Sequence, residues 1–278
     1  MIIEKYRHPV RFYGLSIIIP WLCWFTAAYL SHITPGSSLL LTISSLLGLL
    51  GLTAPMIIAF AMMLPDPELR SDLYNRLFSF SLEKIKPVYL LATFGLMLAS
   101  ILLAQAISLL FGYSPEQFKL AHGFTFTAGI FPAWFMLFMA PIIEELAWHT
   151  YGTDCLRRRF SLFTTNIIFA TFWAFWHFPL SFIKDYYQAN LAEEGLIHSI
   201  NFGVSLIPYV FLMNWLYYKT NRNILVPVVF HISAGFFNEI FMTHPDSKII
   251  QTMLLLILTV FIVIKERDFF FKRGILLD

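Results

Sequence analysis

The sequence is poor in charged residues and in cysteine. Only 13% of its 278 residues are Asp, Glu, Lys or Arg, which is about half of the roughly 25% found in soluble domains. So few charged residues cannot cover the surface of a soluble protein of this length, and the composition therefore excludes a soluble globular enzyme. The content of 58% hydrophobic residues also excludes intrinsic disorder. The two cysteines, Cys23 and Cys155, are widely separated and lie within or beside apolar runs, which excludes a small disulfide-linked scaffold.

Long hydrophobic runs fill the sequence instead. A helix that crosses a bilayer core of about 30 Å needs roughly 20 apolar residues. The runs do not alternate as the strands of a membrane barrel do, and helices satisfy their own backbone groups in hydrocarbon. The sequence therefore predicts an all-α polytopic membrane protein with about eight transmembrane helices. The predicted spans are 12–31, 39–64, 88–111, 127–156, 162–183, 199–218, 223–242 and 249–264.

The basic residues are distributed unevenly between these spans. Sixteen of the nineteen Lys and Arg fall at the two termini and in the even-numbered connections, whereas the odd-numbered connections carry only Lys119, Lys184 and Lys248. Because cytoplasmic loops carry the excess of Lys and Arg, we expect both termini to be cytoplasmic. We expect one membrane-embedded domain over 1–278, in an integral multi-pass protein of the plasma membrane.

The longest polar connection is 65–87. It mixes charges with Leu, Tyr and Phe at helical spacing, which predicts an amphipathic helix on the cytoplasmic surface. A tether is its simplest role, and a lip that guides the substrate is the alternative.

Ionisable residues inside the spans are the most informative feature. Such residues are costly in a bilayer and usually face the interior of the bundle with a function. The fourth span contains Glu144 and Glu145, followed by His149. Adjacent helical positions differ by about 100°, so the carboxylates cannot point the same way, and His149 at i+4 is a partner for Glu145. A buried ion pair that fixes helix packing is the structural alternative.

Two further spans place histidines in the membrane. His177 lies in the fifth span among aromatic residues such as Trp173, which we expect to serve packing or to form an aromatic wall. Taken alone, His177 is explained by a hydrogen bond across the bundle. His231 lies in the seventh span, with Asn238 seven residues later on the same face, roughly 10 Å along the axis. Three separate helices thus carry Glu or His, a pattern typical of a buried hydrolytic site, a metal site or a proton pathway.

At these residues the sequence resembles the CAAX protease and bacteriocin-processing (CPBP) family, which includes the type II CAAX prenyl endopeptidases. That family has the motifs E-E-x-x-x-R, F-x-x-x-H and H-x-x-x-N on separate helices. Here the first is EELAWH at 144–149, with His149 in place of Arg, and the second is WAFWH at 173–177, with Trp in place of Phe. The third begins at His231 but has Gly235 in place of Asn. The resemblance covers about 127–242.

The resemblance implies an intramembrane endopeptidase with a catalytic set of Glu144, Glu145, His177 and His231, supported by His149 and Asn238. Glu144 would activate a water, His177 would help to hold it, and His231 would help to stabilise the oxyanion. The motif departures imply reduced activity, because the loss of one oxyanion donor typically costs about 10²–10³ in rate. We expect the substrate to be a membrane-embedded or lipidated peptide that is cleaved near the cytoplasmic side. The lipid bilayer is the other expected partner, and we expect no binding of nucleic acid.

Two questions stay open on the sequence. No cofactor is favoured, but Zn²⁺ is the alternative, with Glu145, His149, His177 and His231 as candidate ligands; the H-E-x-x-H motif is absent. The alternatives to a protease are a non-catalytic membrane scaffold or bacteriocin self-immunity protein of the same fold and, least favoured, a proton-coupled transporter. A transporter is disfavoured because we find no duplicated halves and no paired broken helices.

Overall fold

Helices make up all the regular structure in the computed structural model, which describes residues 2–78 and 85–273. Within these ranges the only strand-like pairings are the isolated bridges Leu120–Phe241 and Ala128–Phe131. The all-α prediction is confirmed for this part of the chain. The longer helices are α1 (Pro9–Ser31), α2 (Ser38–Met63), α3 (Pro67–Phe78), α4 (Pro87–Ser108), α5 (Ala133–Ala147), α7 (Leu162–His177), α9 (Leu196–Lys219), α10 (Leu225–Ile240) and α11 (Pro245–Lys265). The shorter ones are η1 (Ile2–Lys5), η3 (Leu109–Phe111), η4 (Pro115–Phe118), η5 (Trp148–Gly152), α6 (Thr153–Arg157), η6 (Phe178–Phe182), α8 (Tyr187–Glu194) and α12 (Arg267–Phe271).

All eight predicted spans fall on helices, but not all of these helices are long. Five have the length and apolarity of a membrane span: α1, α2, α4 with η3, α9 and α11. A sixth is reached if α7 and α8 form one bent span. Helix α10 has 16 residues, which is a length of about 24 Å. The number eight and the cytoplasmic placement of the termini therefore stay predictions.

Two predicted spans are interrupted by features that hydropathy does not reveal. The fourth begins only at Ala133, and it passes from α5 through the π-helical turn η5 into α6. The fifth is helical to His177, continues as the 3₁₀ turn η6, and then bends by 83° into α8. Pro179 accounts for the end of α7, because proline has no N–H to donate to the preceding turn.

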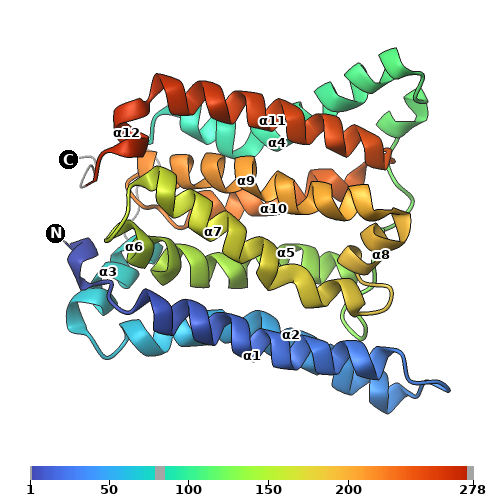
Figure 1. Ribbon diagram of the computed structural model, residues 1–278, viewed down its shortest axis with the longest axis horizontal. Coiled ribbons are helices and arrows are strands. Elements are labelled where there is room, and N and C mark those ends of the chain that lie inside the picture. Colours follow the sequence, from blue (N-terminus) through green and yellow to red (C-terminus); the bar gives the residue numbers. More distant parts are fainter. Residues whose placement is uncertain (1, 79–84, 274–278) are drawn as a thin grey trace.

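The bundle places α5 at its centre. Helices α1 and α2 pack as a pair along one side, and α4 and α11 lie along the opposite side (Figure 1). Between them α5 packs against both α2 and α10, and α7 packs against α9. The pair α1–α2 is close because Gly51 has no side chain: a Cβ there would lie 2.4 Å from Trp24 Nε1. The helix with both glutamates is thus surrounded by other helices.

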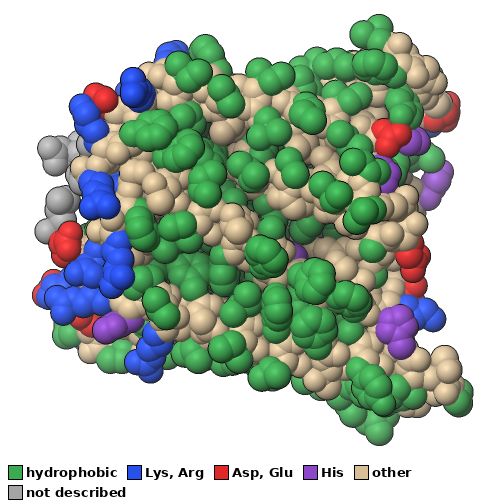
Figure 2. Space-filling view, in the orientation of Figure 1, with side chains coloured by type: hydrophobic (Ala, Val, Ile, Leu, Met, Phe, Trp, Pro, Cys, Tyr) green, Lys and Arg blue, Asp and Glu red, His purple; other side chains and the backbone are tan. Residues whose placement is uncertain are grey.

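The outside of the molecule is apolar between two polar ends. Figure 2 shows hydrophobic side chains over the middle of the face in view and most of its Lys and Arg gathered at one end, near the termini. Outward-facing residues such as Leu91, Ile257 and Ile264 are 72%, 68% and 71% exposed. A surface of this kind suits a bilayer, in agreement with the prediction of an integral multi-pass membrane protein.

The amphipathic connection contains one helix in the part that the structure describes. Helix α3 covers Pro67–Phe78 and buries Leu69, Leu73 and Arg76. The remainder of the predicted helix includes 79–84, which lie outside the described residues.

Candidate active site

The two adjacent glutamates point to different partners, as the helical geometry predicts. Glu144 accepts from the indole Nε1 of Trp173 at 2.9 Å and, more weakly, from that of Trp148 at 3.4 Å. Both indoles reach the same oxygen, Oε2, and no described residue donates to Oε1. A water near Oε1 would therefore meet a carboxylate oxygen whose lone pairs are available.

Glu145 lies behind Glu144 and is fully buried. One of its oxygens contacts Nδ1 of His149, and the other lies 2.7 Å from Nδ1 of His231. Nε2 of His149 lies 2.7 Å from Oδ1 of Asn214, whose amide nitrogen in turn donates to Asn166. Glu145 thus orients His231 across the gap between α5 and α10, and the pairing of His149 with Glu145 is confirmed.

His177 is oriented by its own helix. Its Nδ1 lies 2.7 Å from the backbone carbonyl oxygen of Trp173. Because a carbonyl only accepts, Nδ1 carries the proton, and in the neutral imidazole Nε2 keeps a lone pair. The ring also packs edge-on against Trp176, with centroids 4.9 Å apart.

Three of the predicted catalytic residues line one cavity. Glu144, His177 and His231 contribute to the wall of a space of about 530 Å³, whereas Glu145 and His149 do not. The wall also includes Gly235 and Asn238. The arrangement separates Glu144, which lies on the cavity wall, from Glu145, which contacts His231 from behind it.

Asn238 lies on the same wall but has other partners. Its amide donates to the Tyr187 hydroxyl at 3.0 Å and to Glu239 at 3.2 Å. The position four after His231, Gly235, has no side chain to offer. The structure therefore does not place Asn238 as a direct replacement for an asparagine at 235.

The cavity runs toward the end of the bundle opposite the basic one. Beyond Glu144 its wall reaches the exposed residues Gly36 and Ser37 between α1 and α2. It also reaches Lys184 and Asp185 between η6 and α8. No described residue of α3 lies on this wall, so the part of the connection that the structure describes does not form the predicted lip.

The residues suggested as zinc ligands do not form one group. Glu145 and His149 are away from the cavity wall, while His177 is tied to the backbone of α7. Across residues 2–78 and 85–273 no three His, Cys, Asp or Glu side chains are placed to hold a metal ion. The structure gives no support to a zinc site made of these residues, and metal independence stays a prediction.

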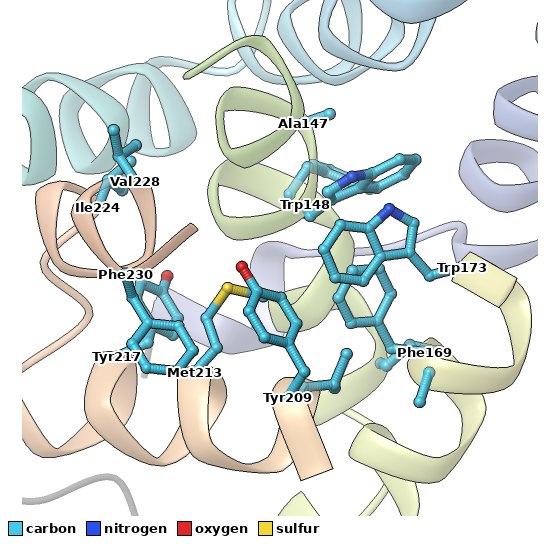
Figure 3. Packing of buried hydrophobic residues seen from close by; sticks show 14 of the residues in the cluster. Ala147, Trp148, Phe169, Trp173, Tyr209, Met213, Tyr217, Ile224, Val228 and Phe230 are labelled. Carbon is cyan, nitrogen blue, oxygen red and sulfur yellow. The ribbon is translucent and has the colours of Figure 1, made fainter. Parts of the chain in front are cut away.

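Several residues that shape the site are aromatic or amide side chains that the sequence does not single out. Trp173 was expected to serve packing, but its indole N–H is the shortest hydrogen bond to Glu144. Figure 3 shows Trp148 and Trp173 with their indoles close together beside α5, within the buried cluster that also contains Phe169 and Tyr209. With aromatics at 18% of the chain, only the i+4 spacing from Glu144 to Trp148 carries a sequence signal.

Comparison with known proteins places these residues in a recognised region. Residues 126–237 match the family model described as type II CAAX prenyl endopeptidase Rce1-like. The chain is 34% identical to CAAX prenyl protease 2 of Methanococcus maripaludis over 274 residues. That alignment covers 98% of this chain and 99% of the relative. The matched region contains both glutamates, His177 and His231.

Proposed function

The chain belongs to the Rce1-like family of type II CAAX prenyl endopeptidases, and from this premise we propose that it hydrolyses a prenylated, membrane-associated peptide inside the cavity lined by Glu144, His177 and His231. Membership makes the protein an integral multi-pass membrane protease and agrees with the motif resemblance. The non-catalytic scaffold or immunity protein is not favoured. The observation that carries the proposal is the meeting of these three side chains, from three helices, on one cavity wall.

Glu144 is the general base of the proposed reaction. Its Oε1 takes a proton from a water as the water oxygen attacks the carbonyl carbon of the scissile bond. The carbonyl becomes a tetrahedral oxyanion, and Glu144 then passes the proton to the departing amine as the C–N bond breaks. Trp173 holds Oε2 at 2.9 Å, so the carboxylate is oriented before the substrate arrives.

The histidines position the water and stabilise the oxyanion. The available lone pair on Nε2 of His177 is able to accept a hydrogen bond from the attacking water. His231 donates its Nδ1–H to Glu145 at 2.7 Å, and in the proposed mechanism it is the imidazolium, so that Nε2 also carries a proton that is directed to the oxyanion. A preorganised group in a water-poor cavity acts strongly on developing charge. Neither step requires a metal.

A lipidated peptide suits the size and the lining of the cavity. Its volume of about 530 Å³ falls in the range of roughly 300–1,000 Å³ typical of ligand sites. Apolar residues such as Leu52, Met97 and Leu255 line it together with the polar groups. The substrate class also follows the name of the relative, CAAX prenyl protease 2.

The direct test is cleavage of a prenylated fluorogenic peptide by the purified protein in detergent or nanodiscs. We expect Glu144→Gln to lower kcat by about 10²–10⁴, because the variant keeps the shape of the side chain but cannot accept the proton. Glu116→Gln, at an exposed glutamate paired with Lys119, is the matched control and should cleave normally. Normal cleavage by Glu144→Gln would remove Glu144 from the mechanism.

Chelation separates the metal-independent mechanism from the zinc alternative. We expect kcat to survive prolonged treatment of the purified protein with 1,10-phenanthroline. Loss of activity that returns on addition of Zn²⁺, with one zinc bound per chain by elemental analysis, would overturn the metal-independent mechanism.

A further inference from the structure

The oxyanion of the proposed reaction needs hydrogen-bond donors, and most donors around Glu144 are already engaged. The indoles of Trp148 and Trp173 donate to Glu144. His177 and His231 each use Nδ1 within the protein, which leaves Nε2 of His177 as an acceptor and Nε2 of the His231 imidazolium as one donor for the oxyanion. Gly235, one turn after His231 on the cavity wall, has no side chain to contribute.

Tyr209 of α9 is a donor without a partner in this region. Its side chain lines the cavity and is only 7% exposed, and its hydroxyl has no hydrogen-bond partner among the described residues. Its ring centroid lies 5.7 Å from those of both Trp173 and His231. In Figure 3 the Tyr209 hydroxyl points away from α9 toward α5, the helix that carries the two glutamates.

Packing alone does not explain the hydroxyl. The Tyr209 ring stacks on Phe230 with centroids 5.3 Å apart, and a phenylalanine ring would serve that contact equally. A buried polar group without a partner costs about 1–3 kcal/mol, and water is scarce in a membrane interior. Trp176 also has an N–H on the cavity wall without a partner among the described residues, but its ring packs against Trp24, Trp148 and His177, whereas the ring of Tyr209 packs against His231.

We propose that the Tyr209 hydroxyl donates a hydrogen bond to the oxyanion of the tetrahedral intermediate, beside His231. The inference rests on the proposed peptidase function and deepens it. The hydroxyl keeps its proton throughout, and the bond strengthens as negative charge develops on the carbonyl oxygen and weakens again as the C–N bond breaks. Tyr209 can act without breaking a hydrogen bond to any described residue, because its hydroxyl has no partner among them.

The primary test is Tyr209→Phe, assayed with the same prenylated peptide. We expect kcat to fall by about 10²-fold with KM unchanged, because the bond is strong only in the transition state. The melting temperature of the purified variant should not fall, since the substitution removes only an unpartnered hydroxyl. An unchanged kcat, or a change confined to KM, would overturn the inference.

Tyr13→Phe is the matched control. Tyr13 also has a buried hydroxyl without a partner among the described residues, but it lies on α1 and does not line the cavity. It should retain the wild-type kcat. A fall in kcat equal to that of Tyr209→Phe would assign the effect to loss of a buried hydroxyl in general and overturn the specific role.

A substitution at Gly235 tests the same inference by adding a second hydrogen-bond donor for the oxyanion. Gly235→Asn places an amide on the cavity wall one turn from His231, and its Cβ would meet the flexible end of Leu137 at 3.2 Å. We expect this change to raise kcat more in the Tyr209→Phe background than in the wild type, because two groups that serve one oxygen are not additive. Equal effects in the two backgrounds would contradict a shared role.

Glu144→Gln, measured in the same series, keeps the two proposals separate. If it abolishes cleavage while Tyr209→Phe cleaves normally, the Tyr209 inference fails and the peptidase mechanism stands. If Glu144→Gln cleaves normally, the mechanism itself fails, and the Tyr209 inference fails with it.

Discussion

The functional role of individual residues could be predicted where the side chain is ionisable and its burial in a bilayer costs free energy. Glu144, His177 and His231 were found because ionisable side chains are rare in apolar runs, and the structure places all three on one wall. The donors to Glu144 were not found in the same way. An indole in an aromatic-rich segment gives no sequence signal about the direction of its N–H, so Trp173 was interpreted as packing.

Trp173→Phe tests whether the indole orients the proposed base. The change keeps most of the ring packing and removes the 2.9 Å hydrogen bond to Glu144. A typical net hydrogen bond is worth about 0.5–1.5 kcal/mol, and one to a charged group about 1.5–3. We therefore expect kcat to fall by roughly tenfold, since 1.4 kcal/mol corresponds to that factor.

Two comparisons sharpen that experiment. Trp148→Phe should have a smaller effect, because its contact of 3.4 Å is long for a hydrogen bond. Trp21→Phe removes a buried indole N–H without a partner among the described residues, away from the cavity wall, and should leave kcat unchanged. Equal activity of the Trp173 and Trp21 variants would show that the indole is packing after all.

At the scale of elements, the hydrophobic runs predict where helices lie but not where they break. The π-helical turn η5 follows Glu145 inside a run that looks continuous in sequence. Its carbonyls are held from outside: Arg76 of α3 donates to the backbone oxygens of His149 at 2.9 Å and Thr150 at 2.8 Å. Such long-range partners could not be read from local composition, and they give α3 a role beyond a tether.

Arg76→Met tests this link between α3 and the turn. Arg76 is buried and also pairs with Asp154 at 3.1 Å and Asp72 at 3.0 Å. Removing one partner of a buried ionic network typically costs about 3–5 kcal/mol, so we expect a clear fall in the melting temperature in detergent. Arg70→Met, on the exposed side of the same helix, should melt like the wild type. A wild-type melting temperature for Arg76→Met would contradict the role of the cluster.

The same cluster predicts a pH dependence of stability. Burial alone would raise the pKa of Asp72, but the charges of Arg76 and Arg222 outweigh burial, and its pKa lies below the ordinary value of 3.8. A lowered folded-state pKa stabilises the protein fully above the unfolded value and progressively less as the pH falls through the folded value. We expect Asp72→Asn to reduce the melting temperature at pH 7 and to reduce it less below pH about 4.

At the scale of the whole molecule, the distribution of Lys and Arg and the position of the cavity together predict the side of the membrane toward which the cavity opens. The N-terminus and α3 lie at the Lys- and Arg-rich end (Figures 1 and 2), while the cavity wall reaches Gly36 and Ser37 in the connection between α1 and α2, at the opposite end of the bundle. If the basic end is cytoplasmic, the polar mouth of the cavity faces away from the cytoplasm. This differs from the expectation of cleavage near the cytoplasmic side, which came from family resemblance and not from the charge pattern.

Cysteine labelling in whole cells decides the orientation. Ser37→Cys at the cavity mouth should react with a membrane-impermeant maleimide, and Lys5→Cys at the basic end should react only after the cells are opened. Background is low because both native cysteines, Cys23 and Cys155, are buried. The reverse pattern would put the cavity mouth in the cytoplasm and make the distribution of Lys and Arg a misleading guide in this chain. Both outcomes identify the side of the membrane from which the peptide enters, because Ser37 lies on the wall of the cavity.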